Sequence, residues 1–193
     1  PLLGEFQIMN ILCAVGMALA SGATPEQMDA VLPKLEGVPG RMEHVATHKG
    51  APIFVDYAHT PGGLEGVLKH LRPHVKGRSV LVFGCGGDRD RGKRPQMGEI
   101  AAQYADQVFV TDDNPRTENP LLIRKDVLAG CPDAEEIGDR KEAIEAAINT
   151  LKKGDALLIA GKGHEKMQII GTVSHPFDDA QVARQATGKK PKQ

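Results

Sequence analysis

Short apolar runs alternate with helical patterns from about Arg41 onward, and this alternation is what most constrains the fold. The apolar runs are 52–55, 79–83, 107–111 and 156–160, each bounded by glycine or aspartate. Short runs of this kind are typical of buried parallel strands. Between them, 64–71 and 144–151 carry apolar residues at helical spacing. The order predicts a mostly parallel sheet covered by helices, an α/β fold.

The first 38 residues have a different texture. Residues 7–20 carry apolar side chains at helical spacing, and a second helix is predicted after Thr24 with Pro25 at its first position. Neither helix can bury its apolar stripe alone, and the turn-rich stretch 37–41 reads as a hinge. We therefore expect 1–38 to be a helical remnant of one domain and 39–193 to be a Rossmann-like domain. We expect the chain, which begins at Pro1, to be a piece of a longer protein.

The end of the chain should add a hairpin and a helix. The stretch 168–177 reads as the hairpin, and the last helix should begin at Asp178. The tail 188–193, rich in lysine, is expected to be frayed.

Composition excludes several classes of protein. The 24 lysines and arginines balance 25 aspartates and glutamates, so the net charge of -1 argues against a chain that binds nucleic acid over its whole surface. No apolar run approaches the roughly 20 residues that span a bilayer, so no membrane insertion is expected. Three distant cysteines without a C-x-x-C pair suit a reducing compartment, and we expect a cytoplasmic protein.

Polar clusters follow each predicted strand, at 56–61, 84–91, 112–116 and 161–165. In an open parallel sheet, ligands bind at the carboxyl ends of the strands. Polar loops also connect strands in proteins where they bind nothing. Four charged, turn-forming loops on one rim nevertheless favour a binding site there.

The charges in these loops suit an amino acid with more than one charged end. Arg89 and Arg116 can each pair with a carboxylate, whereas Asp113 and Glu165 can accept hydrogen bonds from ammonium groups. The alternative for Arg89 is a lattice with its aspartate neighbours that only stiffens the loop. Three further residues are candidates for the site. Asn114 contributes a side-chain amide, Pro115 a rigid backbone and Gly161 an open backbone amide.

A partial phosphate-loop pattern is rejected. Residues 87–93 match G-x-x-x-x-G-K, but Arg94 stands where a serine or threonine should coordinate magnesium. Asp88 and Asp90 would also place negative charge in the phosphate cradle.

No metal site is predicted. His70 and His74 have i, i+4 spacing on a predicted helix, but no third ligand is evident. His44 and His48 have the same spacing in a predicted strand, where they would not converge. Cys85 is interpreted as a small filler residue of the glycine loop.

Several motifs coincide with those of one family, in the same order. From Gly4 to about Ala186 the chain resembles the C-terminal part of the Mur ligases, most closely those that add meso-diaminopimelate. The motifs are G-R-M-E at 40–43, D-Y-A-H-T-P at 56–61, G-G-D-R at 86–89, D-N-P-R at 113–116 and G-K-G-H-E at 161–165.

The resemblance implies a three-domain ATP-dependent ligase in peptidoglycan synthesis. Residues 1–38 would end the central ATPase domain, and 39–193 would bind the amino acid. The enzyme would phosphorylate the D-glutamate carboxylate of UDP-N-acetylmuramoyl-L-alanyl-D-glutamate, and the amine of meso-diaminopimelate would attack the acyl phosphate. The partners implied are ATP, both substrates and the remaining domains. Magnesium would be bound by upstream sequence, so this chain alone should be inactive.

The resemblance also implies roles for particular residues. ATP contacts fall on Asn10, Arg41, Asp56 and His59, with Tyr57 or His59 beside the adenine; Arg41 would act in catalysis by neutralising phosphate charge. The meso-diaminopimelate contacts fall on the D-N-P-R loop 113–116 and on Arg89, Gly161 and Glu165. One departure is Gln7, where the family usually has asparagine, and Gln7 is left out of the site.

Three alternatives remain. A related ligase could add lysine, or could be a folylpolyglutamate synthase, although lysine lacks the distal carboxylate that Arg116 would bind. A non-catalytic amino-acid-binding module is the second. A dinucleotide-binding domain is the third, but the sequence lacks G-x-G-x-x-G between strand and helix.

Overall fold

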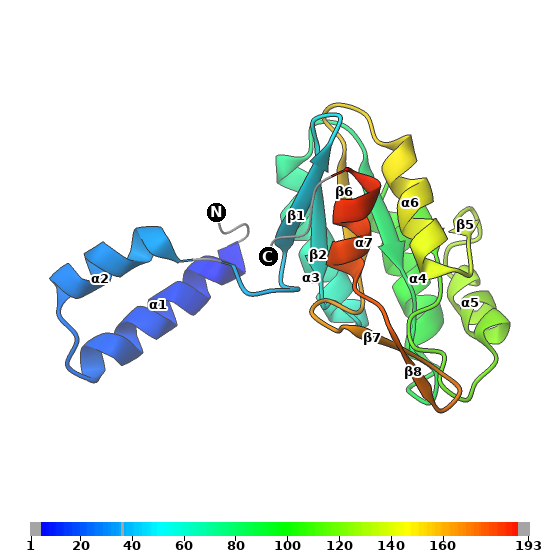
Figure 1. Cartoon of the computed structure of the whole chain (residues 1–193), viewed down its shortest axis with the longest axis horizontal. Coiled ribbons are helices and arrows are strands. Elements are labelled where there is room, and N and C mark those ends of the chain that lie inside the picture. The colour runs from blue at the N-terminus through cyan, green and yellow to red at the C-terminus, as the bar shows by residue number, and fades with distance from the viewer. Residues whose placement is uncertain (1–4, 36, 189–193) are drawn as a thin grey trace. The chain divides into compact units, whose positions relative to one another are not determined.

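The computed structural model describes residues 5–35 and 37–188, with side chains from residue 8 onward. The chain forms two compact units, residues 1–38 and 39–193 (Figure 1). In the part of the chain that the structure describes, no helix is both long and apolar enough to cross a bilayer.

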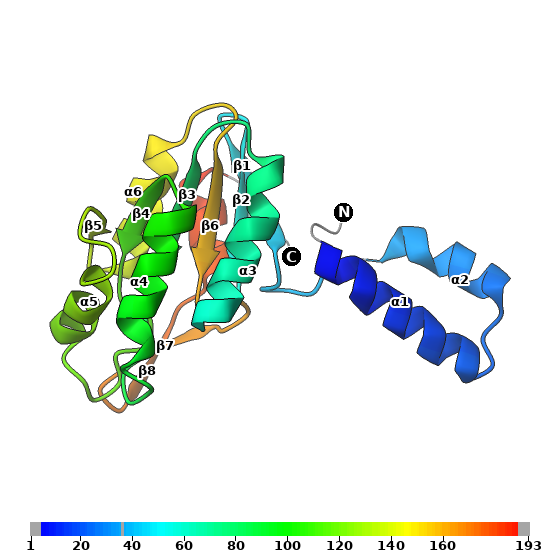
Figure 2. The ribbon, with the colours of Figure 1, turned by 180° about the vertical axis from the view of Figure 1, so that it is seen from behind.

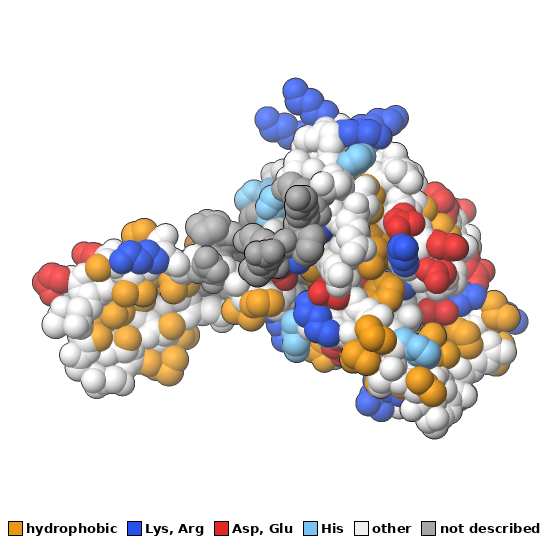
Figure 3. Space-filling view, viewed as in Figure 1, with side chains coloured by type: hydrophobic (Ala, Val, Ile, Leu, Met, Phe, Trp, Pro, Cys, Tyr) orange, Lys and Arg blue, Asp and Glu red, His pale blue; other side chains and the backbone are white. Residues whose placement is uncertain are grey.

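The first unit consists of helices α1 (Glu5–Ala20) and α2 (Pro25–Val31) and the 3₁₀ turn η1 (Leu32–Lys34). The two predicted helices are confirmed. The hydroxyl of Thr24 accepts a hydrogen bond from the amide of Gln27, and the Gln27 side chain accepts one from the Thr24 amide, so α2 begins with a capping box. Much of the apolar surface of α1 and α2 is exposed in this unit (Figure 3).

The second unit is built on a sheet in which the described strands have the order β1-β2-β6-β3-β4-β5. Strands β2, β6, β3, β4 and β5 are parallel, and β1 pairs antiparallel with β2 at the edge. Every side chain of β3 and β6 is buried, which explains why these strands read as continuous apolar runs. The predicted strands are confirmed to within a residue at either end. The bounds are β1 Glu43–His48, β2 Ala51–Asp56, β3 Ser79–Phe83, β4 Gln107–Val110, β5 Glu135–Glu136 and β6 Ala156–Ala160.

Helices cover both faces of the sheet. Helices α3 and α4 lie on one face (Figure 2), and α6 and α7 lie on the other (Figure 1). Helix α3 buries the four leucine and valine side chains predicted from its spacing, and Asp139 caps α6 by accepting from the Glu142 amide. The bounds are α3 Pro61–Leu71, η2 Arg72–His74, α4 Lys93–Tyr104, α5 Pro120–Leu128, α6 Arg140–Thr150 and α7 Asp179–Ala186.

The predicted hairpin is confirmed as β7 (Met167–Ile170) and β8 (Val173–Pro176), and Asp178 caps the last helix. The hairpin is anchored to the loop that follows β4. The Arg116 amide donates to Ile169 O at 3.0 Å, and the Gly171 amide donates to Arg116 O at 2.7 Å. Residues 189–193 of the tail lie outside the described residues.

Candidate functional site

The loops that follow β2, β3, β4 and β6 surround a cavity of about 440 Å³ at the carboxyl end of the sheet. This volume lies in the range of small-molecule sites. The parallel strands explain the convergence, because their carboxyl ends meet at one edge. The cavity contains most of the residues predicted for the site: Tyr57, His59, Arg89, Asp113, Asn114, Arg116, Gly161 and Glu165.

A hydrogen-bond network joins the loop after β4 to the loop after β6. Asn114 Nδ2 donates to Glu165 Oε2 at 2.9 Å. The Nζ of Lys162, which is wholly buried, donates to Asn114 Oδ1 at 3.0 Å and to Glu165 Oε2 at 3.1 Å. Lys162 was not among the predicted site residues. Its only signal was its position between two glycines of the motif 161–165.

Glu165 is therefore held as an anion at the wall of the cavity. Partial burial by itself would raise the pKa of its carboxyl group. Hydrogen bonds from Asn114 and Lys162, together with the charges of Lys162 and Arg116, outweigh burial and hold the pKa below its ordinary value. An ionised, half-buried carboxylate in a cavity is suited to an ammonium group.

Arg116 lies on the cavity wall in an uncommon backbone conformation, with φ of 51°. Its Nη1 donates to Gly87 O at 2.9 Å, and the Gly87 amide donates to Asn114 O at 2.9 Å. A side chain at Gly87 would overlap the carbonyl of Pro115, so only glycine allows this approach. The loops after β3 and β4 are thereby held together. Pro115 itself is buried and does not line the cavity.

Arg89 is exposed at the rim, and its Nη1 donates to the backbone oxygen of Asp88 at 2.9 Å. The lattice that stiffens this loop uses other arginines. Buried Arg94 pairs with Glu118 at 2.9 Å, and exposed Arg91 pairs with the same carboxylate at 3.1 Å. Arg89 is thus the arginine of this loop that lines the cavity.

The structure supports rejecting the phosphate-loop pattern. Amides that such a loop would offer to a phosphate already donate within the protein. The Gly87 amide donates to Asn114 O, the Asp88 amide to Glu118 Oε1 and the Gly92 amide to Asp90 Oδ1. Lys93, which the rejected pattern contains, instead lines the cavity and donates to His59 O at 2.7 Å. It too was missed as a site residue.

Three of the residues expected on the ATP side, Arg41, Tyr57 and His59, belong to an aromatic cluster in the second unit. The Arg41 guanidinium lies 4.9 Å from the centre of the Tyr57 ring. That ring lies 4.6 Å from the His59 ring and 5.3 Å from the His164 ring. Tyr57 and His59 line the cavity. Arg41 does not line it but contacts the ring of Tyr57.

Asp56, which directly precedes Tyr57, is buried and does not line the cavity. Its two carboxylate oxygens accept hydrogen bonds from the amides of Met42 and Ala58, each at 2.8 Å. Burial raises the pKa of Asp56, and these two hydrogen bonds and the charge of Arg41 only partly oppose that effect. In this structure Asp56 ties the start of β1 to the loop after β2.

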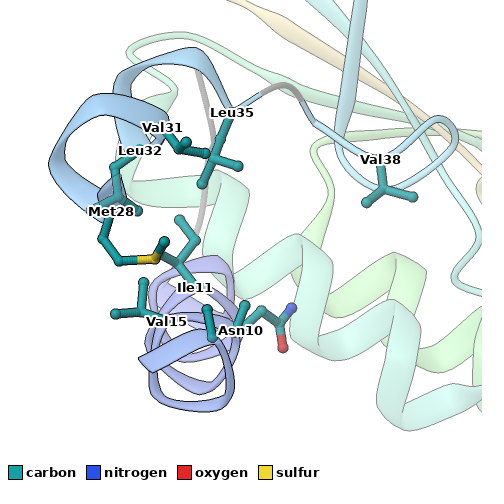
Figure 4. A pocket seen from close by; sticks show the side chains of 10 residues that line it. Asn10, Ile11, Val15, Met28, Val31, Leu32, Leu35 and Val38 are labelled. Atoms are coloured by element: carbon teal, nitrogen blue, oxygen red, sulfur yellow. The ribbon is translucent and has the colours of Figure 1, made fainter. Parts of the chain in front are cut away.

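Asn10 belongs to the first unit, where it lies exposed on α1 at the edge of an apolar cavity of about 360 Å³ (Figure 4). Ile11 and Val15 of α1 face Met28 of α2 across this cavity. The side chain of Gln7 lies outside the described residues.

A further buried cation lies beneath the cavity loops. Arg140 is wholly buried and forms two 2.8 Å hydrogen bonds with Asp179. It also donates to Ala160 O at 3.0 Å, at the end of β6, and to Asp112 O at 3.4 Å, next to Asp113. No sequence pattern marked Arg140, because its burial results from α7 packing on α6.

Among the described residues, no group of three or more histidines, cysteines, aspartates or glutamates could hold a metal ion. The expectation that His70 and His74 share a helix is wrong. Helix α3 ends at Leu71 and His74 lies in η2, because Pro73 lacks the amide hydrogen that would continue the helix. Cys85 packs against Met97 Sδ at 3.7 Å, and burial raises the pKa of its thiol to about 12.

The fold and the cavity define the class of protein, a Rossmann-like α/β domain with a charged cavity at the carboxyl ends of its strands. Residues 40–163 match the family described as Mur ligase, glutamate ligase domain, and the chain belongs to this family.

Known proteins extend the similarity beyond residue 163. The chain is 53% identical over 189 residues to UDP-N-acetylmuramoyl-L-alanyl-D-glutamate--2,6-diaminopimelate ligase of Rhizobium meliloti. The match covers 97% of this chain and 39% of that protein. A solved structure of a ligase of the same name is 45% identical, with a TM-score of 0.77, and the match covers 97% of this chain and 39% of that one.

A folylpolyglutamate synthase of Mycobacterium tuberculosis, solved with ADP and AMPPCP, shares the fold alone. Its TM-score is 0.70 at 21% identity, with 100% of this chain and 42% of that chain covered.

Proposed function

We propose that this chain is the C-terminal part of an ATP-dependent ligase of peptidoglycan synthesis, acting in the cytoplasm. The ligase would join meso-diaminopimelate to the D-glutamate of UDP-N-acetylmuramoyl-L-alanyl-D-glutamate. The name of the relative that is 53% identical over nearly the whole chain supports this reaction. Residues 1–38 would be the end of the central ATPase domain, and 39–193 would be the amino-acid-binding domain.

One observation carries the choice of substrate. A single cavity is lined by the guanidinium groups of Arg89 and Arg116 and by the carboxylates of Asp113 and Glu165, in addition to Asp90 and Lys93. Meso-diaminopimelate carries two carboxylates and two amino groups, so it can pair with both guanidinium groups and with the carboxylates of Asp113 and Glu165. Guanidinium groups bind carboxylates through two parallel hydrogen bonds, which also fixes the orientation of the ligand. Lysine has one carboxylate and would leave one guanidinium without a partner.

The residues of this chain would act by binding and orientation. The reaction converts the D-glutamate carboxylate to an acyl phosphate at the expense of ATP. The free amine of the amino acid then attacks the acyl carbon, and the tetrahedral intermediate releases phosphate. Arg116, Arg89 and Glu165 would hold the amino acid so that its amine is near the acyl carbon, which lowers the entropic part of the barrier.

Arg41 would neutralise charge on the transferring phosphoryl group, where a guanidinium stabilises the transition state. The cluster around Tyr57 fits this task, because it places the exposed Arg41 beside Tyr57, which lines the cavity together with His59. Asp56 would accept hydrogen bonds from the ribose, and Asn10 would contact ATP from the first unit.

ATP and magnesium would also need a phosphate-binding loop, and the chain has no G-x-x-x-x-G-K followed by serine or threonine. The 193-residue chain should therefore not hydrolyse ATP by itself.

Isothermal titration of the 193-residue chain tests this proposal. Meso-diaminopimelate should bind more tightly than L-lysine, and NAD should not bind. Binding of NAD without diaminopimelate would indicate a dinucleotide-binding domain, and stoichiometric turnover of ATP by the chain alone would contradict the assignment of its parts. A complete ligase containing this sequence should then form the amide bond. Diaminopimelate binding in a complete protein without ligation would indicate a non-catalytic amino-acid-binding module.

A further inference from the structure

Lys162 is a buried cation whose hydrogen-bonding capacity is fully used. Its side chain is inaccessible to solvent, and its ammonium group donates to Asn114 Oδ1, Glu165 Oε2 and Met167 O, the last at 2.7 Å. Three donors thus meet three acceptors. A buried charge is costly unless it is paired and hydrogen-bonded, so the arrangement of these acceptors and the lysine depend on each other.

The lysine determines which way the Asn114 amide faces. Asn114 Oδ1 accepts from Lys162 Nζ and from the Ile169 amide at 2.9 Å, while Nδ2 donates to Glu165. The reversed amide would direct its two N–H bonds at an ammonium group and at a backbone N–H. That orientation would lose all of these hydrogen bonds.

The same contacts leave the two oxygens of Glu165 unequal. Oε2 accepts from both Asn114 and Lys162. Within the part of the chain that the structure describes, no group donates to Oε1. Because Glu165 lines the cavity and its side chain is 34% exposed, Oε1 is the oxygen left for a ligand.

We propose that Lys162 is a positioning residue for the amino-acid substrate. It fixes Asn114 and Glu165 so that one oxygen, Glu165 Oε1, is presented to an ammonium group of the incoming amino acid. This inference rests on the proposed function. Lys162 does not itself touch the substrate, because it is buried behind Glu165.

The test uses a complete ligase that contains this sequence, with meso-diaminopimelate as the varied substrate. Lys162→Met keeps the length of the side chain and removes its three donors. The KM for diaminopimelate should rise about ten- to a hundredfold, the range that corresponds to losing one hydrogen bond to a charged group. The KM for ATP and kcat should stay within about threefold, because the lysine acts on binding of one substrate.

A double-mutant cycle separates positioning from packing. If Lys162 acts through the charge of Glu165, then Lys162→Met should cost less than about threefold when introduced into Glu165→Gln. Lys166→Met is the matched control. It removes a lysine of the same loop that is 60% exposed and pairs with Asp178, so its KM should equal that of the wild type.

Each outcome has one meaning. A wild-type ligase that does not use diaminopimelate would contradict the proposed function. If the wild type uses diaminopimelate, two results would overturn the positioning role. One is a Lys162→Met variant with the same KM for diaminopimelate as Lys166→Met. The other is an increase in KM from Lys162→Met that is as large in Glu165→Gln as in the wild type. If Lys162→Met does not fold, ¹⁵N NMR of the wild-type Lys162 ammonium group replaces it. That signal should shift on addition of diaminopimelate, and an unshifted signal at saturation would refute the role.

Discussion

Asn114 donates its side-chain amide to Glu165 across 2.9 Å, although the two residues are 51 positions apart. They come from loops that follow β4 and β6, which are separated in the sheet by β3. The buried ammonium group of Lys162 donates a hydrogen bond to each of them. The candidate site is therefore a hydrogen-bonded unit of two loops, so a change in one loop should be felt in the other.

Arg116 should decide the preference for diaminopimelate over lysine. If Arg116 pairs with the distal carboxylate in a partly desolvated cavity, Arg116→Ala leaves that charge unpaired. The cost should be about 2–5 kcal/mol, or tens- to thousands-fold in kcat/KM for diaminopimelate. Lysine has no such carboxylate and should lose much less. The measurement is kcat/KM for both amino acids in the complete ligase.

Arg91→Ala is the control for Arg116→Ala. Arg91 belongs to the neighbouring loop, its side chain is 72% exposed, and it pairs with Glu118 outside the cavity. The Arg91→Ala ligase should prefer diaminopimelate over lysine as strongly as the wild type does. If Arg116→Ala also keeps that preference, Arg116 serves only to hold Gly87.

Arg41 should matter for the rate more than for binding of the amino acid. Arg41→Ala in the complete ligase should lower kcat by about tenfold or more, because a charge that assists phosphoryl transfer is lost. The KM for diaminopimelate should change less, since Arg41 does not line the cavity. Arg72→Ala, which removes an exposed arginine of η2, is the control. An unchanged kcat would remove Arg41 from the mechanism.

The Arg140–Asp179 pair should be the costliest ion pair to break. Both side chains are fully buried, and Arg140→Met leaves Asp179 as an unpaired buried carboxylate. The free energy of unfolding should fall by about 3–5 kcal/mol, whereas replacing both residues with apolar ones should recover most of the loss. Denaturant unfolding of the 193-residue chain measures this. Lys141→Met, at an exposed neighbour, should change stability by less than about 0.5 kcal/mol. A similarly small change for Arg140→Met would show that α7 packs without the pair.

The three thiols should differ sharply in reactivity. The reactive species is the thiolate, and burial raises the pKa of Cys85 to about 12 and that of Cys131 to about 11. Cys13 is exposed on α1. In the native 193-residue chain at pH 8, a disulfide reagent should therefore titrate one thiol quickly, and three after denaturation. Cys13→Ser should abolish the fast phase. Rapid labelling that survives this substitution would mean that Cys85 or Cys131 is accessible.

The elements of the fold were predictable because their signals are local. The buried strand 156–160 is a continuous apolar run, and Asp139 and Asp178 lie where helix caps are expected. The convergence of the four polar loops was also predictable, since parallel strands carry their carboxyl ends to one edge. The end of α3 was the local error, and Pro73 explains it.

By itself, the sequence determined the α/β class, the order of the elements and most of the charged residues of the cavity, because spacing and turn chemistry act over a few residues. Only the tertiary structure decided which of the charged residues are buried and what they contact. Lys162 and Arg140 look like ordinary surface residues in the sequence, yet both are inaccessible to solvent. Their burial follows from the position of β6 between β2 and β3 and from α7 packing on α6, and these long-range contacts leave no local pattern.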